Sequence, residues 1–107
     1  MKLWVDDLRP APPGYRWARS VDEARDIITD FEKYKSMNRL APDAEIELID
    51  LDHDAGDYAD LGGNYIELLK WLEKNGAVYD IRLHTMNIVG RENMRAIIRA
   101  NGWKEVL

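Results

Sequence analysis

The chain is 107 residues long, 46% hydrophobic and 33% charged, which is enough apolar material for one core and predicts a single domain over residues 1–107. The absence of cysteine excludes disulfides and thiolate metal sites, and a net charge of −5 disfavours broad nucleic-acid binding, because an acidic surface repels phosphate backbones. No apolar run approaches the ~20 residues that cross a bilayer, and the N-terminus turns acidic too early for a signal peptide, so we expect a cytoplasmic protein that binds no membrane.

Two short strands are predicted on either side of a proline-rich loop. Residues 2–5 form an apolar run that ends in two carboxylates, and residues 15–18 alternate as a second strand. Three prolines and a glycine within residues 9–14 exclude a helix between these strands. A helix follows, because Ser20 and Glu23 have the spacing of a capping box and an apolar stripe continues to about residues 34–37.

The second half of the chain alternates strands and helices. Residues 46–51 predict a central strand, and a polar, glycine-containing loop follows it over residues 55–63. Asn64 is expected to cap the next helix, which Gly76 ends. The remaining predicted elements are a helix over 65–75, a strand over 80–85, a loop over 86–90, a helix over 91–101 and a final strand or docked tail over 103–107.

This order predicts an α/β fold with a flavodoxin-like, receiver-like doubly wound parallel sheet in the strand order 2-1-3-4-5. Helical crossovers favour parallel pairing, and here the first crossover helix is replaced by the proline-rich loop. Ligands of such sheets bind beyond the carboxyl ends of the strands, where the order reverses between strands one and three. We therefore expect a ligand site at that edge.

Acidic residues and both histidines follow the strands that end at this edge. Asp6 and Asp7 follow the first strand, Asp52 follows the third, and His53 and His84 complete the group. Crowded carboxylates raise the pKa of at least one member unless a cation joins them. We predict that Asp6, Asp7 and Asp52 hold a divalent cation, most readily Mg²⁺ or Mn²⁺.

The two histidines indicate a role beyond metal binding. His53 and His84 are candidate general acid and base groups, and a cation beside an imidazole suits phosphoester chemistry. If they ligate, two imidazoles shift the preference toward Mn²⁺, Zn²⁺ or Fe²⁺. Asp50 lies one pleat inside Asp52 on the same face, where we expect a structural role. The role of Asp54 stays open.

The segment after the fourth strand offers an anion site. Residues 87–91 lead into a helix N-terminus, whose free N–H groups favour phosphate. Arg91 is expected in the first helical turn, where a ligand phosphate offsets its unfavourable position. Arg9 is expected to close on the same phosphate from the loop after the first strand. The partner is thus a small phosphorylated ligand.

The acidic pair, Asp52 and Thr85 together resemble the receiver domain of response regulators. That resemblance implies an acidic metal site, a phosphoacceptor at Asp52 and a hydroxyl at Thr85 that contacts the phosphate. The sequence departs from receivers in two respects, because it has no equivalent of their phosphate-contacting lysine and no first crossover helix.

Three ordered motifs carry a closer resemblance, to the cyclic-phosphate processing receiver-like family, a derivative of receiver domains with added histidines. The motifs are Trp4-Val5-Asp6-Asp7-Leu8-Arg9-Pro10, Leu51-Asp52-His53-Asp54-Ala55-Gly56 and His84-Thr85-Met86-Asn87-Ile88-Val89-Gly90-Arg91-Glu92-Asn93-Met94. The resemblance implies metal ligation by Asp6, Asp7 and Asp52, acid/base roles for His53 and His84, and phosphate contacts from Arg9, Asn87 and Arg91. The family's usual proline in the third motif is replaced by Ile88-Val89.

The sequence leaves three functions open. The first is a metal-dependent phosphoesterase that acts on a small cyclic phosphate or a phosphorylated nucleotide derivative, the ADP-ribose type included. The second is a non-catalytic receiver-like module that is switched by phosphorylation of Asp52 or by nucleotide binding. The third is an interaction module with a degenerate site.

Overall fold

A computed structural model describes residues 1–107 and shows five parallel strands in one sheet. The strand order is β2-β1-β3-β4-β5, so the predicted doubly wound topology is confirmed. The strands are β1 (Lys2–Val5), β2 (Tyr15–Ala18), β3 (Leu48–Leu51), β4 (Ile81–Leu83) and β5 (Glu105–Val106). No helix of the structure is long and apolar enough to span a bilayer.

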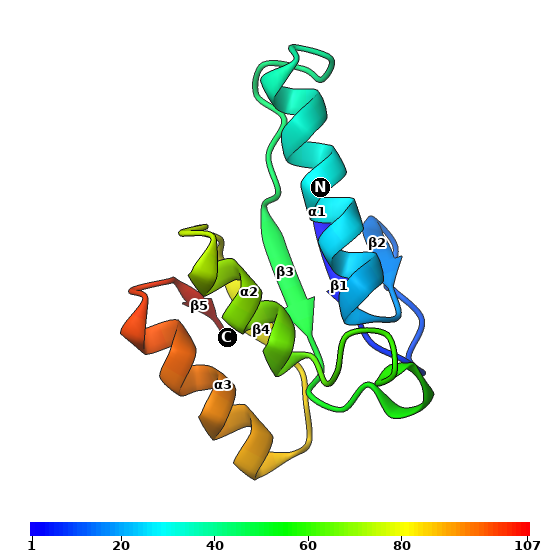
Figure 1. Cartoon of the computed structure of the whole chain (residues 1–107), viewed down its shortest axis with the longest axis vertical. Helices are drawn as coiled ribbons and strands as arrows, with labels where there is room; N and C mark the ends of the chain where they lie inside the picture. Colours follow the sequence, from blue (N-terminus) through cyan, green and yellow to red (C-terminus); the bar gives the residue numbers. More distant parts are fainter.

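Three helices lie on one face of this sheet (Figure 1). They are α1 (Val21–Ser36), α2 (Ile66–Lys74) and α3 (Ile88–Ala100). They connect β2 to β3, β3 to β4 and β4 to β5, so all three crossovers run in the same direction across the sheet. Right-handed crossovers that all run in one direction place their helices on the same face. The step from β1 to β2 runs the other way and has no helix, so the opposite face, here called the open face, carries none.

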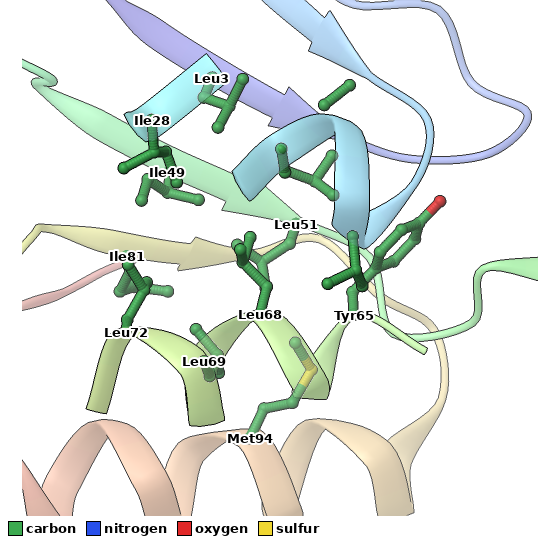
Figure 2. Packing of buried hydrophobic residues seen from close by; sticks show 14 of the residues in the cluster. Leu3, Ile28, Ile49, Leu51, Tyr65, Leu68, Leu69, Leu72, Ile81 and Met94 are labelled. Atoms are coloured by element: carbon green, nitrogen blue, oxygen red, sulfur yellow. The ribbon is translucent and has the colours of Figure 1, made fainter. Parts of the chain in front are cut away.

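The core fills the space between the sheet and the three helices. Its 19 buried residues include Leu3, Ile49 and Ile81 from the strands, which pack against leucines of α2 and Met94 of α3 (Figure 2). Side chains alternate along each strand, so every second residue of β1, β3 and β4 enters this core. The remaining strand residues project onto the open face.

The open face carries aromatic and charged side chains. The pairing register aligns Trp17, Trp4, Asp50 and Arg82 across β2, β1, β3 and β4, so these four side chains share that face. Trp4 is buried there although no helix covers it. The proline-rich loop takes part in its cover, because the Trp4 indole Nε1 donates to the carbonyl oxygen of Arg9 at 2.9 Å.

Two helix starts differ from the sequence prediction. α3 begins at Ile88, three residues early, because the Asn87 side chain accepts from the backbone N–H of Gly90 and so caps the helix. Arg91 is therefore the fourth residue of α3 and not its first. Asn64 does not cap α2, because its Oδ1 accepts from the N–H of Ala55 across the loop. That loop also contains a short 3₁₀ helix over Gly56–Tyr58.

Candidate functional site

Two carboxylates and an imidazole meet at the carboxyl edge of the sheet. One potential ligand atom from each of Asp6, Asp52 and His84 lies within 4.8 Å of the others. Asp6 follows β1, Asp52 follows β3 and His84 follows β4, so three neighbouring strands position them. We call these three residues the Asp-Asp-His group.

Each of the two carboxylates of the group is anchored through one oxygen by backbone N–H groups. Asp6 Oδ1 accepts from the N–H groups of Leu8 and Arg9, both at 2.9 Å, while Asp6 Oδ2 lies 2.8 Å from Nε2 of His84. Asp52 Oδ1 accepts from the N–H of His53 at 2.8 Å. The fold thus fixes the orientation of both carboxylates before any ligand arrives, which lowers the cost of binding.

His84 is held through both ring nitrogens. Its Nδ1 lies 2.7 Å from Asp50 Oδ1 and its Nε2 lies 2.8 Å from Asp6 Oδ2. The ring also stacks on Trp4, with 3.8 Å between the ring centroids and 4° between the planes. Its side chain is 8% exposed. This imidazole is rigidly placed, and a cation that binds Nε2 must displace the hydrogen bond to Asp6.

The electrostatics of the acidic residues are unequal. Burial raises the pKa of Asp6, but the N–H groups of Arg9 and Leu8 together with His84 outweigh burial and hold this pKa below its usual range. Burial raises the pKa of Asp7, and the charges of Asp6 and Asp52 raise it further. Asp7 is therefore the residue whose pKa is raised, as the sequence predicted for one member of a crowded group of carboxylates.

Asp7 lies beside the Asp-Asp-His group but does not belong to it. Its side chain packs against Gly56, where an added Cβ would lie 2.4 Å from Asp7 Oδ2. Gly56 has φ +53°, a left-handed conformation that glycine adopts without strain. The Asp7 carbonyl oxygen accepts from the Arg19 guanidinium at 2.8 and 3.1 Å. Of the three predicted carboxylates, the structure brings Asp6 and Asp52 together with His84.

His53 differs from His84 in having one ring nitrogen without a protein partner. His53 Nδ1 lies 2.9 Å from Asp54 Oδ1, and Nε2 makes no hydrogen bond within the protein. The hydrogen bond from His53 holds the pKa of Asp54 below its usual range, as expected of an ionised acceptor. The ring packs against α3 at Gly90, where an added Cβ would lie 2.5 Å from His53 Cγ. With Nδ1 as donor, Nε2 is left as a proton acceptor.

Arg9 is the cation nearest to the Asp-Asp-His group. Its Nε lies 3.8 Å from Asp6 Oδ2 and its Nη2 lies 4.0 Å from Asp52 Oδ2. Its Nη1 donates to the carbonyl oxygen of His84 at 3.4 Å, and its side chain is half exposed. The guanidinium therefore lies at the group with donors free for an anion.

The other predicted phosphate contacts are engaged in the β4–α3 connection. Thr85 is buried, and its hydroxyl oxygen accepts from the N–H of Asn87 at 3.1 Å. Asn87 Nδ2 donates to Asp54 Oδ2 at 3.3 Å. Arg91 donates to the carbonyl oxygen of Thr85, while its Nε is buried without a hydrogen-bond partner. These three residues shape the loop that carries His84.

The donor set fits a divalent cation. Carboxylate oxygens suit Mg²⁺ and Mn²⁺, and the imidazole nitrogen shifts the preference toward Mn²⁺, Zn²⁺ or Fe²⁺. Sequence reasoning placed all three members of the Asp-Asp-His group at this edge, although it assigned His84 an acid/base role and not a ligand role. It expected a structural role for Asp50 and missed the contacts of Trp4 with His84 and of Gly90 with His53. The alternation of β3 and β4 signals Asp50, because Asp50 precedes Asp52 by two residues on the same strand. Nothing local in the sequence signals that Gly90 meets His53.

Comparison with known protein families matches residues 1–100 to the cyclic-phosphate processing receiver domain. The match covers nearly the whole chain, and it includes all three motifs quoted above. The chain therefore belongs to this family. No curated protein and no solved structure matches it at a significant level.

Proposed function

We propose that this member of the cyclic-phosphate processing receiver family is a metal-dependent phosphoesterase, which opens a cyclic phosphate on a small molecule such as a nucleotide or an ADP-ribose-type derivative. The observation that carries the proposal is the division between the histidines. His84 joins Asp6 and Asp52 with both nitrogens engaged, whereas His53, which follows Asp52 in the chain, has no protein partner at Nε2. A cation site next to a proton acceptor is what phosphoester hydrolysis requires.

Asp6, Asp52 and His84 would hold the cation, which neutralises the phosphoryl oxygens and polarises the phosphorus when bound. Arg9 lies at the same group with a half-exposed guanidinium, and it would bind a second phosphoryl oxygen. The phosphate would then lie between the cation and the half-exposed Arg9 side chain. A cyclic phosphodiester carries one negative charge, which the cation and the guanidinium would both attract.

His53 would move the proton. Its Nε2 accepts a proton from the attacking water, whose oxygen forms a bond to phosphorus, and the bond from phosphorus to one ring-ester oxygen breaks. The proton passes from His53 to that leaving oxygen, so the product is a phosphomonoester with a free hydroxyl. Asp54, 2.9 Å from Nδ1, stabilises the protonated ring during the step.

Two variants separate metal binding from proton transfer. The protein is incubated with Mn²⁺ and a panel of cyclic phosphates, namely 2′,3′- and 3′,5′-cyclic nucleotides and ADP-ribose 1″,2″-cyclic phosphate, and hydrolysis is followed by phosphorus NMR. His53→Gln is expected to bind Mn²⁺ normally and to lose about 10²–10⁴-fold in turnover. His84→Gln is expected to lose both Mn²⁺ affinity and turnover.

The matched control is Glu67→Gln, which removes an exposed carboxylate on α2 that pairs with Lys70. It should behave as the wild-type protein in both assays. The proposal is wrong if no cyclic phosphate of the panel is hydrolysed, or if hydrolysis continues unchanged in His53→Gln.

Phosphorylation of Asp52 is the second candidate, because its carboxylate is 14% exposed and lies where receivers accept a phosphoryl group. Two observations weaken it, since the sequence has no equivalent of the receiver lysine and the Thr85 hydroxyl oxygen already accepts from Asn87. Treatment with acetyl phosphate and Mg²⁺ followed by intact mass spectrometry tests it. An added phosphoryl group that Asp52→Asn abolishes would favour the switch over the phosphoesterase.

A further inference from the structure

The open face of the sheet contains an ion cluster of Asp50, Arg82 and His84 behind the Asp-Asp-His group. Asp50 in the middle of β3 is completely buried, yet it carries a carboxylate and not an apolar side chain. Burial of a charge is costly unless the charge is paired and hydrogen-bonded. The partners of Asp50 therefore identify the reason for its position.

Asp50 uses its two oxygens on two different residues of β4 and its extension. Oδ1 lies 2.7 Å from Nδ1 of His84, and Oδ2 lies 3.1 Å from Nη1 of Arg82. The pairing register places Asp50 beside Arg82, and alternation along the chain brings His84 to the same face two residues later. Trp4, the register partner of Asp50 on β1, stacks on the imidazole.

Arg82 alone would satisfy a structural role for Asp50, since the ion pair links β3 to β4. The contact with His84 adds something that this role does not need. A carboxylate is an acceptor only, so Nδ1 of His84 must carry the proton of this hydrogen bond. Asp6 is likewise an acceptor only, so in the metal-free protein Nε2 donates to Asp6 Oδ2. A cation that displaces this proton would take the Nε2 lone pair, while Nδ1 keeps its proton toward Asp50.

We propose that Asp50 is a positioning residue for His84: it fixes the ring through Nδ1 and thereby turns Nε2, as a ligand atom, toward Asp6 and Asp52. This inference rests on the metal site of the proposed function and names the residue that prepares it. Trp4 restricts the ring plane from one side, and Arg82 keeps the second oxygen of Asp50 engaged. Asp50 itself contacts neither the cation nor the substrate.

The variant Asp50→Asn tests this role, because an amide has one oxygen and one NH₂ group. Arg82 can only donate, so it retains the amide oxygen and the NH₂ group faces His84. Nδ1 must then accept, so the one ring proton stays on Nε2, where it faces Asp6 and blocks the cation. We expect Zn²⁺ affinity, measured by calorimetric titration, to fall about 10- to 100-fold.

The double variant Asp50→Asn with Arg82→Met provides the rescue. Without Arg82 the amide is free to rotate, and its oxygen can accept from Nδ1 of His84 again. We expect the Nδ1 proton to return and most of the Zn²⁺ affinity to be recovered. A purely structural role predicts the opposite, because the double variant has lost the link between β3 and β4 completely. Asp80→Asn, just before β4, is the matched control for loss of one negative charge.

Nitrogen–proton correlation spectra of the imidazole give a readout that does not depend on activity. In the wild-type protein the Nδ1 proton of His84 should be present without metal and should persist when Zn²⁺ is added, while any proton on Nε2 disappears. In metal-free Asp50→Asn the Nδ1 proton should be absent. This wild-type measurement holds even if the variant does not fold.

The outcomes separate the two proposals. Absence of the Nδ1 proton in the wild-type protein, unchanged Zn²⁺ affinity in Asp50→Asn, or failure of the double variant to recover affinity would each overturn the role of Asp50. If the wild-type protein binds neither Zn²⁺ nor Mn²⁺, the metal-dependent function is overturned. The metal-free spectra then still decide whether Asp50 fixes the His84 ring.

Discussion

The helix-covered face and the open face of the sheet are built from alternate residues of the same strands, yet they differ in chemistry. Within β3, Ile49 belongs to the apolar core, whereas its neighbour Asp50 lies on the open face in an ion cluster. On β1, Leu3 and Val5 enter the core while Trp4 stacks on His84. The two faces have different roles. Burial of apolar side chains on the helix-covered face stabilises the fold, and the contacts of Asp50 and Trp4 on the open face position the His84 imidazole.

The absence of the first crossover helix explains why the open face can do this. A helix over β1 and β3 would bury that face and require apolar partners there. The proline-rich loop covers Trp4 through the carbonyl oxygen of Arg9 instead, and it also brings the Arg9 guanidinium to the carboxylates. The replacement of the first crossover helix by a proline-rich loop thus leaves one face of the sheet without helices and also brings Arg9 to the ligand site.

The largest expected effect is on the helix-covered face. Ile49→Ala should lower the free energy of unfolding by about 2–5 kcal/mol, because it leaves a cavity in a fully buried position. Urea unfolding measures the loss, and Mn²⁺ titration of the folded variant should give the wild-type affinity. Ile49→Val is the milder companion, with an expected loss of about 0.5–1.5 kcal/mol. Loss of metal binding in either folded variant would contradict the division between the faces.

The second effect concerns the Asp-Asp-His group. Mn²⁺ at about 100 times its dissociation constant should raise the free energy of unfolding by about 2.7 kcal/mol, because the cation binds the folded chain only. Removal of the cation with a chelator should reverse the gain. The Mn²⁺-dependent gain in the free energy of unfolding should be small in Asp52→Asn. The control Asp60→Asn, in an exposed loop, should show the same gain as the wild-type protein. A gain that persists in Asp52→Asn would place the cation elsewhere.

The third effect is at the contact between α3 and His53. Alanine is favoured over glycine in a helix by about 1 kcal/mol, but the Cβ of Gly90→Ala would lie 2.5 Å from ring atoms of His53. We expect the ring to be displaced and hydrolysis of a cyclic phosphate to fall at least about tenfold, with no gain in stability. Ala96→Gly, at an exposed position of the same helix, should cost about 1 kcal/mol without affecting hydrolysis.

The smallest expected effect tests the one strong ion pair on the helix-covered side. Two hydrogen bonds from Arg95, at 2.8 and 2.7 Å, hold the pKa of Glu105 below its ordinary value of 4.5. Glu105→Gln should therefore cost about 1 kcal/mol at pH 7. A lowered pKa stabilises the folded state above pH 4.5, so the difference between wild type and variant should shrink as pH falls through the pKa of folded Glu105.

The half-exposed pair of Glu67 and Lys70 serves as its control, with an expected cost below about 0.5 kcal/mol for Glu67→Gln. An equal effect of both substitutions would mean that the Arg95 pair has no special contribution. Hydrolysis and Mn²⁺ binding should not change in Glu105→Gln, since the pair lies on the covered side, away from His84.

Local patterns in the sequence were sufficient for the fold. The apolar run of residues 2–5 and the alternation of residues 15–18 gave strands with the observed bounds, and the Ser20 cap of α1 is confirmed at 3.0 Å from Ser20 Oγ to the N–H of Glu23. The start of α3 was misplaced because Gly90 looked like a loop residue. In the structure Asn87 caps the helix ahead of Gly90, and the tertiary contact with His53 leaves no room for a Cβ at that position.

The site could be predicted only in part. Strand order and chain position sufficed to bring Asp6, Asp52 and His84 to one edge, because parallel strands end together. They did not show that Asp7 turns toward Gly56, since two adjacent residues in a loop can point in different directions. Nor did they show that His84 and His53 have different partners, because hydrogen bonds at ring nitrogens depend on distant side chains, such as Asp50 for His84.

The Asp-Asp-His group also determines how much of the chain a fragment must contain in order to form the site. Asp6 and His84 are separated by 78 positions in the chain, yet their side chains meet at 2.8 Å. Contacts between such distant segments form only when the intervening strands are paired, which makes them slow to assemble in folding. No excised fragment or grafted loop that lacks β1 or β4 would therefore carry the site, and protein engineers would have to transplant the sheet as a whole.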